Sequence, residues 1–309
     1  MSNTRLSLVE RAAEVYDFAS GLPLARPPQD LPPPREPTRP VVEERSRTQQ
    51  ARAEQAAPHK PVHPPVRHAQ VELDRARLAQ NGFLTPDAPA ATSLAEEVRL
   101  IKRRLLAAVD ARAEHGDQAA RIVLVASGQP GDGKTFIAAN LALSIAGEQD
   151  RSVLLIDGDT TKPDLMARLG LEDGPGLVDA LADAVDPETL VLDSDVGCLS
   201  VLPAGRKERN IPELLSSART AAVLERLLSA DPRRIIVIDS PPVLASSCAA
   251  VLAGHAGQTL VVVRADRTSE ADLNEAVELL SACDQVSLVL NSAAFQVGSK
   301  RFGQYEEYR

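Results

Sequence analysis

The sequence contains few cysteines and no long apolar run, and both absences exclude classes of protein. Its three cysteines, Cys198, Cys248 and Cys283, are far apart, without a Cys-x-x-Cys spacing or a nearby histidine. This pattern argues against a disulfide framework and a zinc site and is typical of a reducing cytosol. We therefore predict that the three cysteines are small, buried apolar residues. No stretch approaches the roughly 20 apolar residues that cross a bilayer, and the N-terminus lacks the apolar core of a signal peptide, so we expect a soluble chain.

Positive charge is also scarce, with 34 Lys and Arg against 43 Asp and Glu and a formal net charge of −9. The first 90 residues are nearly neutral, so the acidic excess lies in the remainder, which holds 22 basic and 32 acidic residues. A domain with this charge binds nucleic acid poorly. We therefore expect no nucleic-acid partner.

Large apolar runs are almost absent between Pro23 and Pro89, which holds 14 of the 23 prolines. We expect residues 21–68 to be a disordered, extended linker whose histidines, including His68, are solvated rather than bound to a metal. Before it, apolar residues at three- and four-residue steps predict a short amphipathic helix within residues 1–20. This helix would dock on its own domain or on a partner.

Residues 69–291 carry the apolar runs of one folded domain. Its short strands are continuously apolar and alternate with helices, which predicts a mostly parallel sheet with helices on both faces, an α/β fold. The predicted strands are Ile122–Ala126, Val153–Ile156, Leu199–Leu202, Ile235–Ile238, Leu260–Val263 and Val286–Leu290. The predicted helices are Val71–Gln80, Leu94–Val109, Lys134–Ala146, Leu177–Ala184, Ile211–Leu228, Ser246–Ala253 and Ser269–Ala282.

The segment Gly128–Thr135, after the first of these strands, satisfies the phosphate-binding pattern G-x-x-x-x-G-K-[ST] in full. Its glycines let several N–H groups face one anion, and the following helix adds its positive dipole end. Lys134 can reach the β- and γ-phosphates, and the Thr135 hydroxyl can bind magnesium. We therefore predict a P-loop NTPase fold that binds ATP with Mg²⁺. The predicted contacts are Gly128, Gln129, Pro130, Gly131, Asp132, Gly133, Lys134, Thr135 and Phe136.

Aspartates follow two other strands of the predicted sheet. Asp157 and Asp159 come after the second strand, and Asp239 ends a third. Since ligands of parallel sheets bind beyond the carboxyl ends of the strands, these carboxylates can hold Mg²⁺ and orient or deprotonate a hydroxyl. Strand-end aspartates alone are more often turn caps, but the P-loop beside them favours the metal site.

Two of the three tyrosines, Tyr305 and Tyr308, lie in the polar segment 292–309, which we expect to be a flexible tail. The 14 residues from Asn291 to Tyr305 can span up to about 46 to 50 Å. A tail of this length can bring Tyr305 to an active site in the same or a neighbouring subunit. Without the ATP site, both would be interpreted as incidental surface tyrosines.

From about Glu72 to its end, the chain resembles the bacterial tyrosine kinases of capsule and exopolysaccharide synthesis. The segment SGQPGDGKT resembles the Walker A motif of that family, LLIDGDTTKP its Walker A-prime and IIVIDSPPVL its Walker B. The segments SLVERAAE, LDRARLAQNGFLTPD and LAEEVRLIKRRLL are similar to the subgroup found beside exosortase-linked polysaccharide loci.

The resemblance implies ATP-dependent autophosphorylation of Tyr305 and Tyr308, with the acceptor usually in a neighbouring subunit of a ring. Asp159 would orient the phenol or accept its proton, and Asn291 would contact adenine. The implied catalytic residues are Lys134, Asp157, Asp159 and Asp239, and the implied magnesium ligands are Thr135, Asp157 and Asp239.

The same resemblance suggests an oligomer and a membrane partner. Glu96 and Arg99 match the first two positions of the oligomerisation pattern E-x2-R-x2-R of the family, whereas the third position is Lys102. We expect no membrane-spanning activator to be fused to the chain. The resemblance therefore implies a separate membrane-spanning polysaccharide co-polymerase, which would hold the protein at the inner face of the plasma membrane.

Two other interpretations remain open. A partition or positioning ATPase shares this sheet, but its members carry a lysine at the position of Gln129. A non-catalytic nucleotide switch that regulates a co-polymerase would use the same ATP-binding residues, so the sequence does not distinguish it from a kinase.

Overall fold

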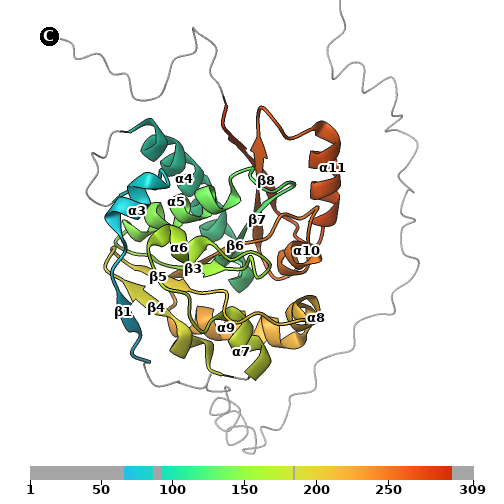
Figure 1. Cartoon of the computed structure of the whole chain (residues 1–309). Coiled ribbons are helices and arrows are strands. Elements are labelled where there is room, and N and C mark those ends of the chain that lie inside the picture. The colour runs from blue at the N-terminus through green and yellow to red at the C-terminus, as the bar shows by residue number, and fades with distance from the viewer. Residues whose placement is uncertain (1–65, 86–91, 184, 294–309) are drawn as a thin grey trace, which may run out of the picture. The chain divides into compact units, whose positions relative to one another are not determined.

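The computed structural model describes residues 66–85, 92–183 and 185–293, which belong to one compact unit. These residues form an eight-stranded sheet in the order β1-β4-β5-β3-β6-β2-β7-β8 (Figure 1). Neighbouring strands are parallel except β4 and β5, which are antiparallel. The strands are β1 (Ala69–Val71), β2 (Ile122–Ser127), β3 (Ser152–Asp157), β4 (Leu192–Ser194), β5 (Leu199–Leu202), β6 (Arg234–Asp239), β7 (Gln258–Arg264) and β8 (Val286–Asn291).

The predicted mostly parallel α/β fold is confirmed, and all six predicted strands are present. Strands β2 and β6 are buried along their whole length, because helices cover both faces of the sheet. This explains why their sequences are continuously apolar rather than alternating. The predicted helix of residues 1–20, most of the linker, and both tail tyrosines lie outside the described residues.

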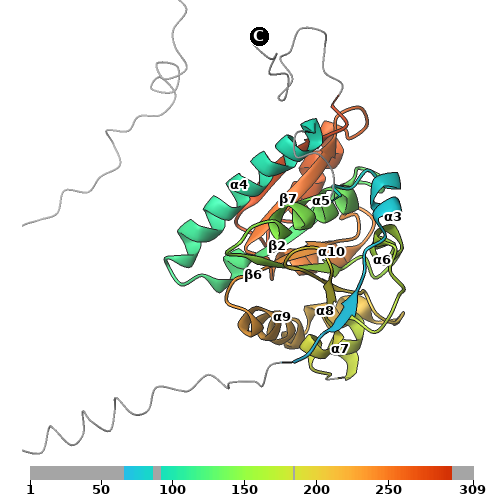
Figure 2. The same ribbon diagram turned by 90° about the vertical axis from the view of Figure 1, so that its left-hand side faces the viewer.

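The helices divide between the two faces of the sheet. Helices α3 to α6 pack against one apolar cluster, and α7 to α11 pack against the cluster on the other face. Figure 2 shows α4 alongside α5 on the first of these faces. None of the helices in the described part of the chain combines the length and apolar character needed to span a bilayer. The helices are α3 (Arg75–Gln80), α4 (Ser93–Ala113), α5 (Lys134–Ala146), α6 (Leu165–Leu169), α7 (Leu177–Asp183), α8 (Ile211–Ser216), α9 (Ala218–Ala230), α10 (Ser247–Ala253) and α11 (Glu270–Leu279).

The predicted helix Val71–Gln80 is shorter in the structure. Val71 ends β1, and α3 begins after Asp74, whose carboxylate accepts hydrogen bonds from two backbone N–H groups of the first turn at 2.8 and 3.0 Å. An aspartate in an extended conformation with such bonds is a helix N-cap. The prediction therefore missed both a strand and the cap that separates it from the helix.

The predicted helix Ile211–Leu228 is two helices, α8 and α9. Ser217 lies between them with an extended backbone (φ −73°, ψ 155°), and its hydroxyl donates to the Leu214 carbonyl oxygen at 2.6 Å. A serine that bonds to the backbone in this way competes with helix continuation. The short elements β4 and α6 were also missed, because three and five residues show no periodicity.

Two of the three cysteines confirm the prediction of buried apolar residues: Cys248 and Cys283 are buried and free. Cys198 is free but exposed, so the prediction was wrong there. It lies in the turn between β4 and β5, directly after Gly197, which has a positive φ of 52°.

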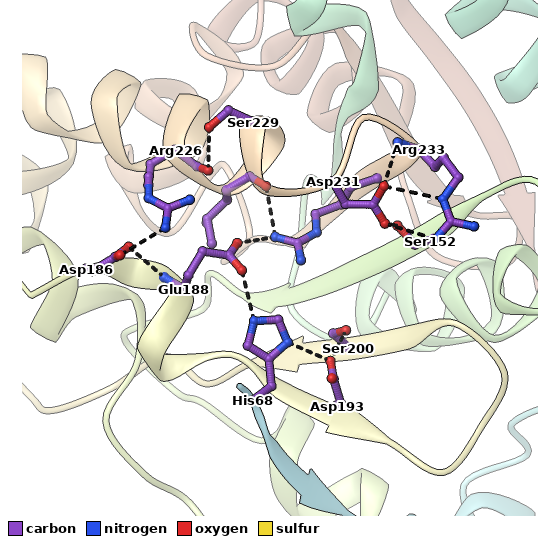
Figure 3. A network of polar contacts seen from close by, with 12 residues as sticks. His68, Ser152, Asp186, Glu188, Asp193, Ser200, Arg226, Ser229, Asp231 and Arg233 are labelled. Carbon is purple, nitrogen blue, oxygen red and sulfur yellow. Dashed lines mark hydrogen bonds and ion pairs between the residues drawn. The ribbon is translucent and has the colours of Figure 1, made fainter. Parts of the chain in front are cut away.

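His68 is not the solvated linker residue that the sequence predicts. Strand β1 pairs with β4, which brings His68 Nδ1 to 2.9 Å from Asp193 Oδ1, while its Nε2 lies 2.9 Å from Glu188 Oε2 (Figure 3). Glu188 also forms an ion pair with Arg234, at the amino end of β6. His68 thus connects the start of the folded domain to a buried polar network.

Candidate nucleotide-binding site

The phosphate-binding loop lies at the carboxyl end of β2, between β6 and β7 in the sheet. Gly131 and Gly133 have φ values of +87° and +105°, which disfavour residues with a Cβ. Helix α5 begins at Lys134, the residue predicted from the sequence. The loop and the helix therefore present backbone N–H groups at the edge of the sheet where parallel folds bind ligands.

The loop is held by hydrogen bonds of its own and by one from β8. Within it, Asp132 Oδ2 accepts from the N–H of Gln129 at 2.9 Å, and Ser127 Oγ donates to the Gln129 carbonyl oxygen at 3.0 Å. From β8, Asn291 Nδ2 donates to the carbonyl oxygen of Asp132 at 2.9 Å. A Cβ on Gly133 would lie 2.1 Å from that amide nitrogen, so the contact requires glycine. The resemblance implies an adenine contact for Asn291, whereas its amide nitrogen here supports the loop.

Phe136 differs from the other predicted nucleotide contacts, because its side chain packs against the apolar cluster of its own face. Its ring lies 6.2 Å from that of Phe83, at an angle of 42°. Asn140 on the same helix accepts a hydrogen bond from the N–H of Leu84 at 2.7 Å. The ring of Phe136 therefore serves to fix the segment after α3 onto α5.

The three predicted aspartates lie beside the loop. Asp157 and Asp239 are direct neighbours in the parallel pairing of β3 with β6, and each is 1% exposed. Gly158 approaches β6 so closely that its N–H donates to the Asp239 carbonyl oxygen at 2.8 Å, and a Cβ there would lie 2.8 Å from that oxygen. The glycine after Asp157 thus lets β3 approach β6 closely enough for the two buried carboxylates to be neighbours.

Both buried carboxyl groups have raised pKa values. Burial, followed by the charge of Asp239, raises the pKa of Asp157 to about 8. Burial raises the pKa of Asp239 to about 7, although the charge of Lys134 and a hydrogen bond from Thr135 lower it. Asp157 Oδ2 and Asp239 Oδ1 are buried without a hydrogen-bond partner. Buried carboxylates are normally paired with a cation or bound to a metal ion, so these two oxygens are suited to bind a cation.

The residues present fit a magnesium ion. Among the described residues, no group of three or more His, Cys, Asp or Glu side chains could hold a metal ion. Magnesium at phosphate sites is bound by one or two carboxylates, with waters and substrate phosphates completing the shell. Two carboxylates with unbonded oxygens and the Thr135 hydroxyl beside one of them match that ligand set.

Lys134 and Asp159 form an ion pair, with Nζ 3.1 Å from Oδ2. Both side chains are largely buried. The other oxygen of Asp159 accepts from the N–H of Lys162 at 3.1 Å, and the N–H of Asp159 donates to Asp157 Oδ1 at 3.1 Å. The predicted phosphate-binding lysine and the predicted proton acceptor therefore neutralise each other in this state.

The residues with a predicted oligomer contact lie on α4, away from the loop. Glu96 and Arg99 are partly exposed and pair with each other. Lys102 is 7% exposed, donates from Nζ to the Ser144 carbonyl oxygen at 3.0 Å and pairs with Glu148. Its charge is thus used within the chain at the end of α5, which counts against a contact of Lys102 with another subunit.

The turn after β7 also contributes residues that the sequence analysis missed. Arg264 Nη1 donates to the Gly131 carbonyl oxygen at 3.4 Å, and Arg267 lies in the same turn. The available signal was their place after a strand, at the edge where ligands bind. An arginine at this position belongs to no motif, so it could not be distinguished from a surface residue.

The glycine loop, the helix that follows it and the paired strand-end aspartates define a P-loop nucleotide-binding protein. No family model matches the chain. It is 31% identical over 192 residues to the tyrosine-protein kinase YwqD from Bacillus subtilis, a match that covers 62% of this chain and 78% of that relative. The chain belongs to this family of bacterial tyrosine-protein kinases.

Further matches agree with that membership. The tyrosine-protein kinase Wzc from Salmonella typhimurium is 31% identical over 192 residues, which cover 62% of this chain. The chain spans about a quarter of the length of Wzc and of EpsB from Ralstonia solanacearum. Among solved structures, the VpsO kinase domain is 33% identical with a TM-score of 0.50, and the match covers 62% of this chain and 96% of that one. The BceF tyrosine kinase domain is 29% identical with a TM-score of 0.51, and the match covers 62% and 76% of the two chains.

Proposed function

We propose that this chain is an ATP-dependent protein-tyrosine autokinase that phosphorylates its own Tyr305 and Tyr308 and regulates the synthesis and export of an exopolysaccharide or capsule. One observation carries the proposal. Two buried, neighbouring aspartates, Asp157 and Asp239, have oxygens without partners directly beside a complete phosphate-binding loop. Relatives of the chain are named tyrosine-protein kinases, which supports a tyrosine as the residue that accepts the phosphate.

Lys134 and Asp159 have complementary roles in the proposed reaction. When a triphosphate occupies the loop, the ammonium of Lys134 turns from Asp159 to the β- and γ-phosphates, which releases the Asp159 carboxylate. The phenolic oxygen of the tail tyrosine then bonds to the γ-phosphorus as the bond from that phosphorus to the bridging oxygen breaks and ADP leaves. Asp159 takes the phenolic proton, because a phenol with a pKa near 10 is a poor nucleophile at neutral pH.

Thr135, Asp157 and Asp239 would hold Mg²⁺ in this site. The ion supplies positive charge that balances the β- and γ-phosphate oxygens during transfer. Its binding requires both aspartates to be ionised, whereas their raised pKa values favour the protonated forms in the empty site. Asn291 serves the same site by holding the loop backbone, and its position at the end of β8 also suits a contact with the adenosine moiety.

The proposed organisation beyond the site follows the family. An N-terminal helix within residues 1–20 and a linker of residues 21–68 precede the kinase domain of residues 69–291, and residues 292–309 carry the acceptors. Partly exposed Glu96 and Arg99 on α4 are the proposed contacts between subunits. A separate membrane-spanning co-polymerase would activate the kinase at the inner face of the plasma membrane.

The decisive measurement is mass-spectrometric mapping of phosphotyrosine after incubation of the full chain with ATP and Mg²⁺, with and without a candidate membrane activator. We expect phosphate on Tyr305 or Tyr308 and none in Lys134→Met. Tyr16→Phe is the matched control, because it removes the one other tyrosine and should leave the signal intact. ATP hydrolysis without phosphotyrosine under both conditions would instead favour a nucleotide switch.

The role of Asp159 needs its own variant. Asp159→Asn retains the shape of the side chain and its ability to bond to Lys134, but it cannot accept the phenolic proton at neutral pH. We expect autophosphorylation to fall by about 100-fold or more while ATP still binds. Full activity of this variant would remove the assignment of Asp159 as the base.

A further inference from the structure

The turn between β7 and α11 brings a second arginine to the tip of the phosphate-binding loop. A Cβ built on Gly131 would lie 3.0 Å from Nη1 of Arg267, so this guanidinium lies against the loop backbone. Arg264 Nη1 donates to the Gly131 carbonyl oxygen at 3.4 Å. Two guanidinium groups thus approach one residue of the loop, and neither belongs to the loop itself.

The position of this turn relative to the loop is fixed by the backbone. The N–H groups of Arg267 and Thr268 both donate to the carbonyl oxygen of Arg264, at 3.1 and 2.9 Å, and the N–H of Arg264 donates to Thr268 Oγ1 at 2.9 Å. The N–H of Ala265 donates to the Asn291 carbonyl oxygen at 3.0 Å. Asn291 also bonds to the loop, so the turn and the loop share one support.

The charges of the two arginines are used differently. Arg264 donates to both oxygens of Asp266, from Nε at 2.9 Å and from Nη2 at 3.5 Å. Arg267 is exposed, and within residues 66–85, 92–183 and 185–293 its charge acts on Asp266 only through space, since the hydrogen bonds to that carboxylate come from Arg264. An exposed guanidinium with no hydrogen bond among these described residues therefore lies against the predicted phosphate-binding loop.

The order of the strands shows which part of a nucleotide this charge would meet. The aspartates of the magnesium site lie on β3 and β6, on one side of β2, whereas Arg267 follows β7 on the other side. If the γ-phosphate lies towards the aspartates, as in the proposed function on which this inference rests, the other phosphates run towards β7. The geometry points to Arg267 as a residue that binds the α- and β-phosphates from outside the loop, with Arg264 as the residue that positions the turn.

The test is calorimetric titration of the full chain with ADP and, separately, with inorganic tripolyphosphate. Arg267→Ala should weaken both ligands by a similar factor, roughly 10- to 100-fold, as expected for one charge-assisted hydrogen bond. Arg267→Lys should lose less, since it keeps the charge but not the planar fork. Arg233→Ala, an exposed arginine at the opposite end of the sheet, is the matched control and should bind both ligands like the wild type.

Each outcome separates this inference from the kinase proposal. Unchanged binding of both ligands by Arg267→Ala overturns the inference, as does weakened binding of ADP with unchanged binding of tripolyphosphate, which would place the guanidinium on the nucleoside. A wild-type chain that binds neither ligand overturns the inference and the proposed function together. Weakened binding of both ligands by the variant, with no phosphotyrosine in the wild type, supports the inference while the kinase proposal fails.

Discussion

Two regions of the domain bury carboxylates to almost the same extent, but only one of them provides partners for all the carboxylate oxygens. Near the amino end of β6, Glu188 is 2% exposed, and its two oxygens contact Arg234 and His68. Beyond the carboxyl end of the same strand, Asp157 and Asp239 are each 1% exposed, and each has one oxygen without a partner. Burial alone therefore does not distinguish Glu188 from these two aspartates, whereas the partners of their oxygens do.

This difference has a physical basis. A buried charge is tolerated when the fold provides a counter-charge, and Arg234 provides it for Glu188. At the other end, the nearest cation, Lys134, pairs with Asp159 instead, and the pKa values of Asp157 and Asp239 rise. The fold thus supplies a complete partner set in one region and leaves the set incomplete in the region that we assign to magnesium.

The largest expected effect on stability comes from removing Arg234, the counter-charge of the buried Glu188. Arg234→Met keeps an apolar stem of similar length but leaves Glu188 buried without its arginine. We expect the free energy of unfolding to fall by about 3–5 kcal/mol, measured by urea denaturation at pH 7. The double variant Arg234→Met with Glu188→Gln should recover part of that loss. A loss below about 1 kcal/mol in the single variant would contradict the view that Glu188 depends on this partner.

A change in stability of the opposite sign is expected for Asp157, whose carboxylate has an oxygen without a partner. Because the pKa of Asp157 is raised to about 8, the native state between pH 4 and pH 8 retains a proton that the unfolded chain has lost. The stability of the empty wild type should therefore decrease as pH rises through this range. Asp157→Asn does not ionise, so its free energy of unfolding should match that of the wild type near pH 4 and exceed it by an amount that grows towards pH 8.

Ligand removal sharpens the same prediction. Thermal unfolding at pH 8 with Mg²⁺ and ADP should show a large stabilisation of the wild type relative to the sample with EDTA, because the ion supplies the partner that the carboxylates lack. Asp157→Asn should gain less from Mg²⁺ at equal ADP. A variant that is less stable than the wild type at pH 8 without ligand would argue that Asp157 is a structural residue.

The sequence predicts the arrangement of the candidate site better than that of the His68 network. The phosphate loop, Lys134, Thr135 and the three aspartates follow strands long enough to appear as continuous apolar runs, and the parallel sheet brings strand ends to one edge. The network around His68 was missed, because it depends on β1 and β4, strands of three residues that pair across more than a hundred positions. Local patterns carry no information on such pairing.

The support that Asn291 gives to the loop was missed for a similar reason. The family resemblance implied an adenine contact for Asn291, but the hydrogen bond to Asp132 depends on the distance between β8 and the loop. The tight approach at Gly133 shows that two segments more than 150 positions apart are fitted to each other. Lys102 illustrates the same limit, because a helical pattern does not reveal that α5 ends beside it.

A moderate effect is expected for His68→Ala. The side chain is 12% exposed and contacts one oxygen each of Glu188 and Asp193. Its loss leaves Glu188 with Arg234, so we expect a decrease of about 1–2 kcal/mol in the free energy of unfolding, less than for Arg234→Met. Hydrogen exchange of the β1 amides, followed by mass spectrometry, should accelerate in the same variant, because His68 precedes that strand. Unchanged exchange would show that the β1–β4 pairing alone holds this segment.

The smallest effect is expected one position away from the largest. Arg233 also pairs with an aspartate, Asp231, but its side chain is 54% exposed, against 7% for Arg234. Solvent screens an exposed pair and already satisfies its carboxylate, so Arg233→Ala should change the free energy of unfolding by less than about 1 kcal/mol in the same urea titration. A loss as large as that of Arg234→Met would mean that proximity to the amino end of β6, and not the burial of an uncompensated carboxylate, determines the cost.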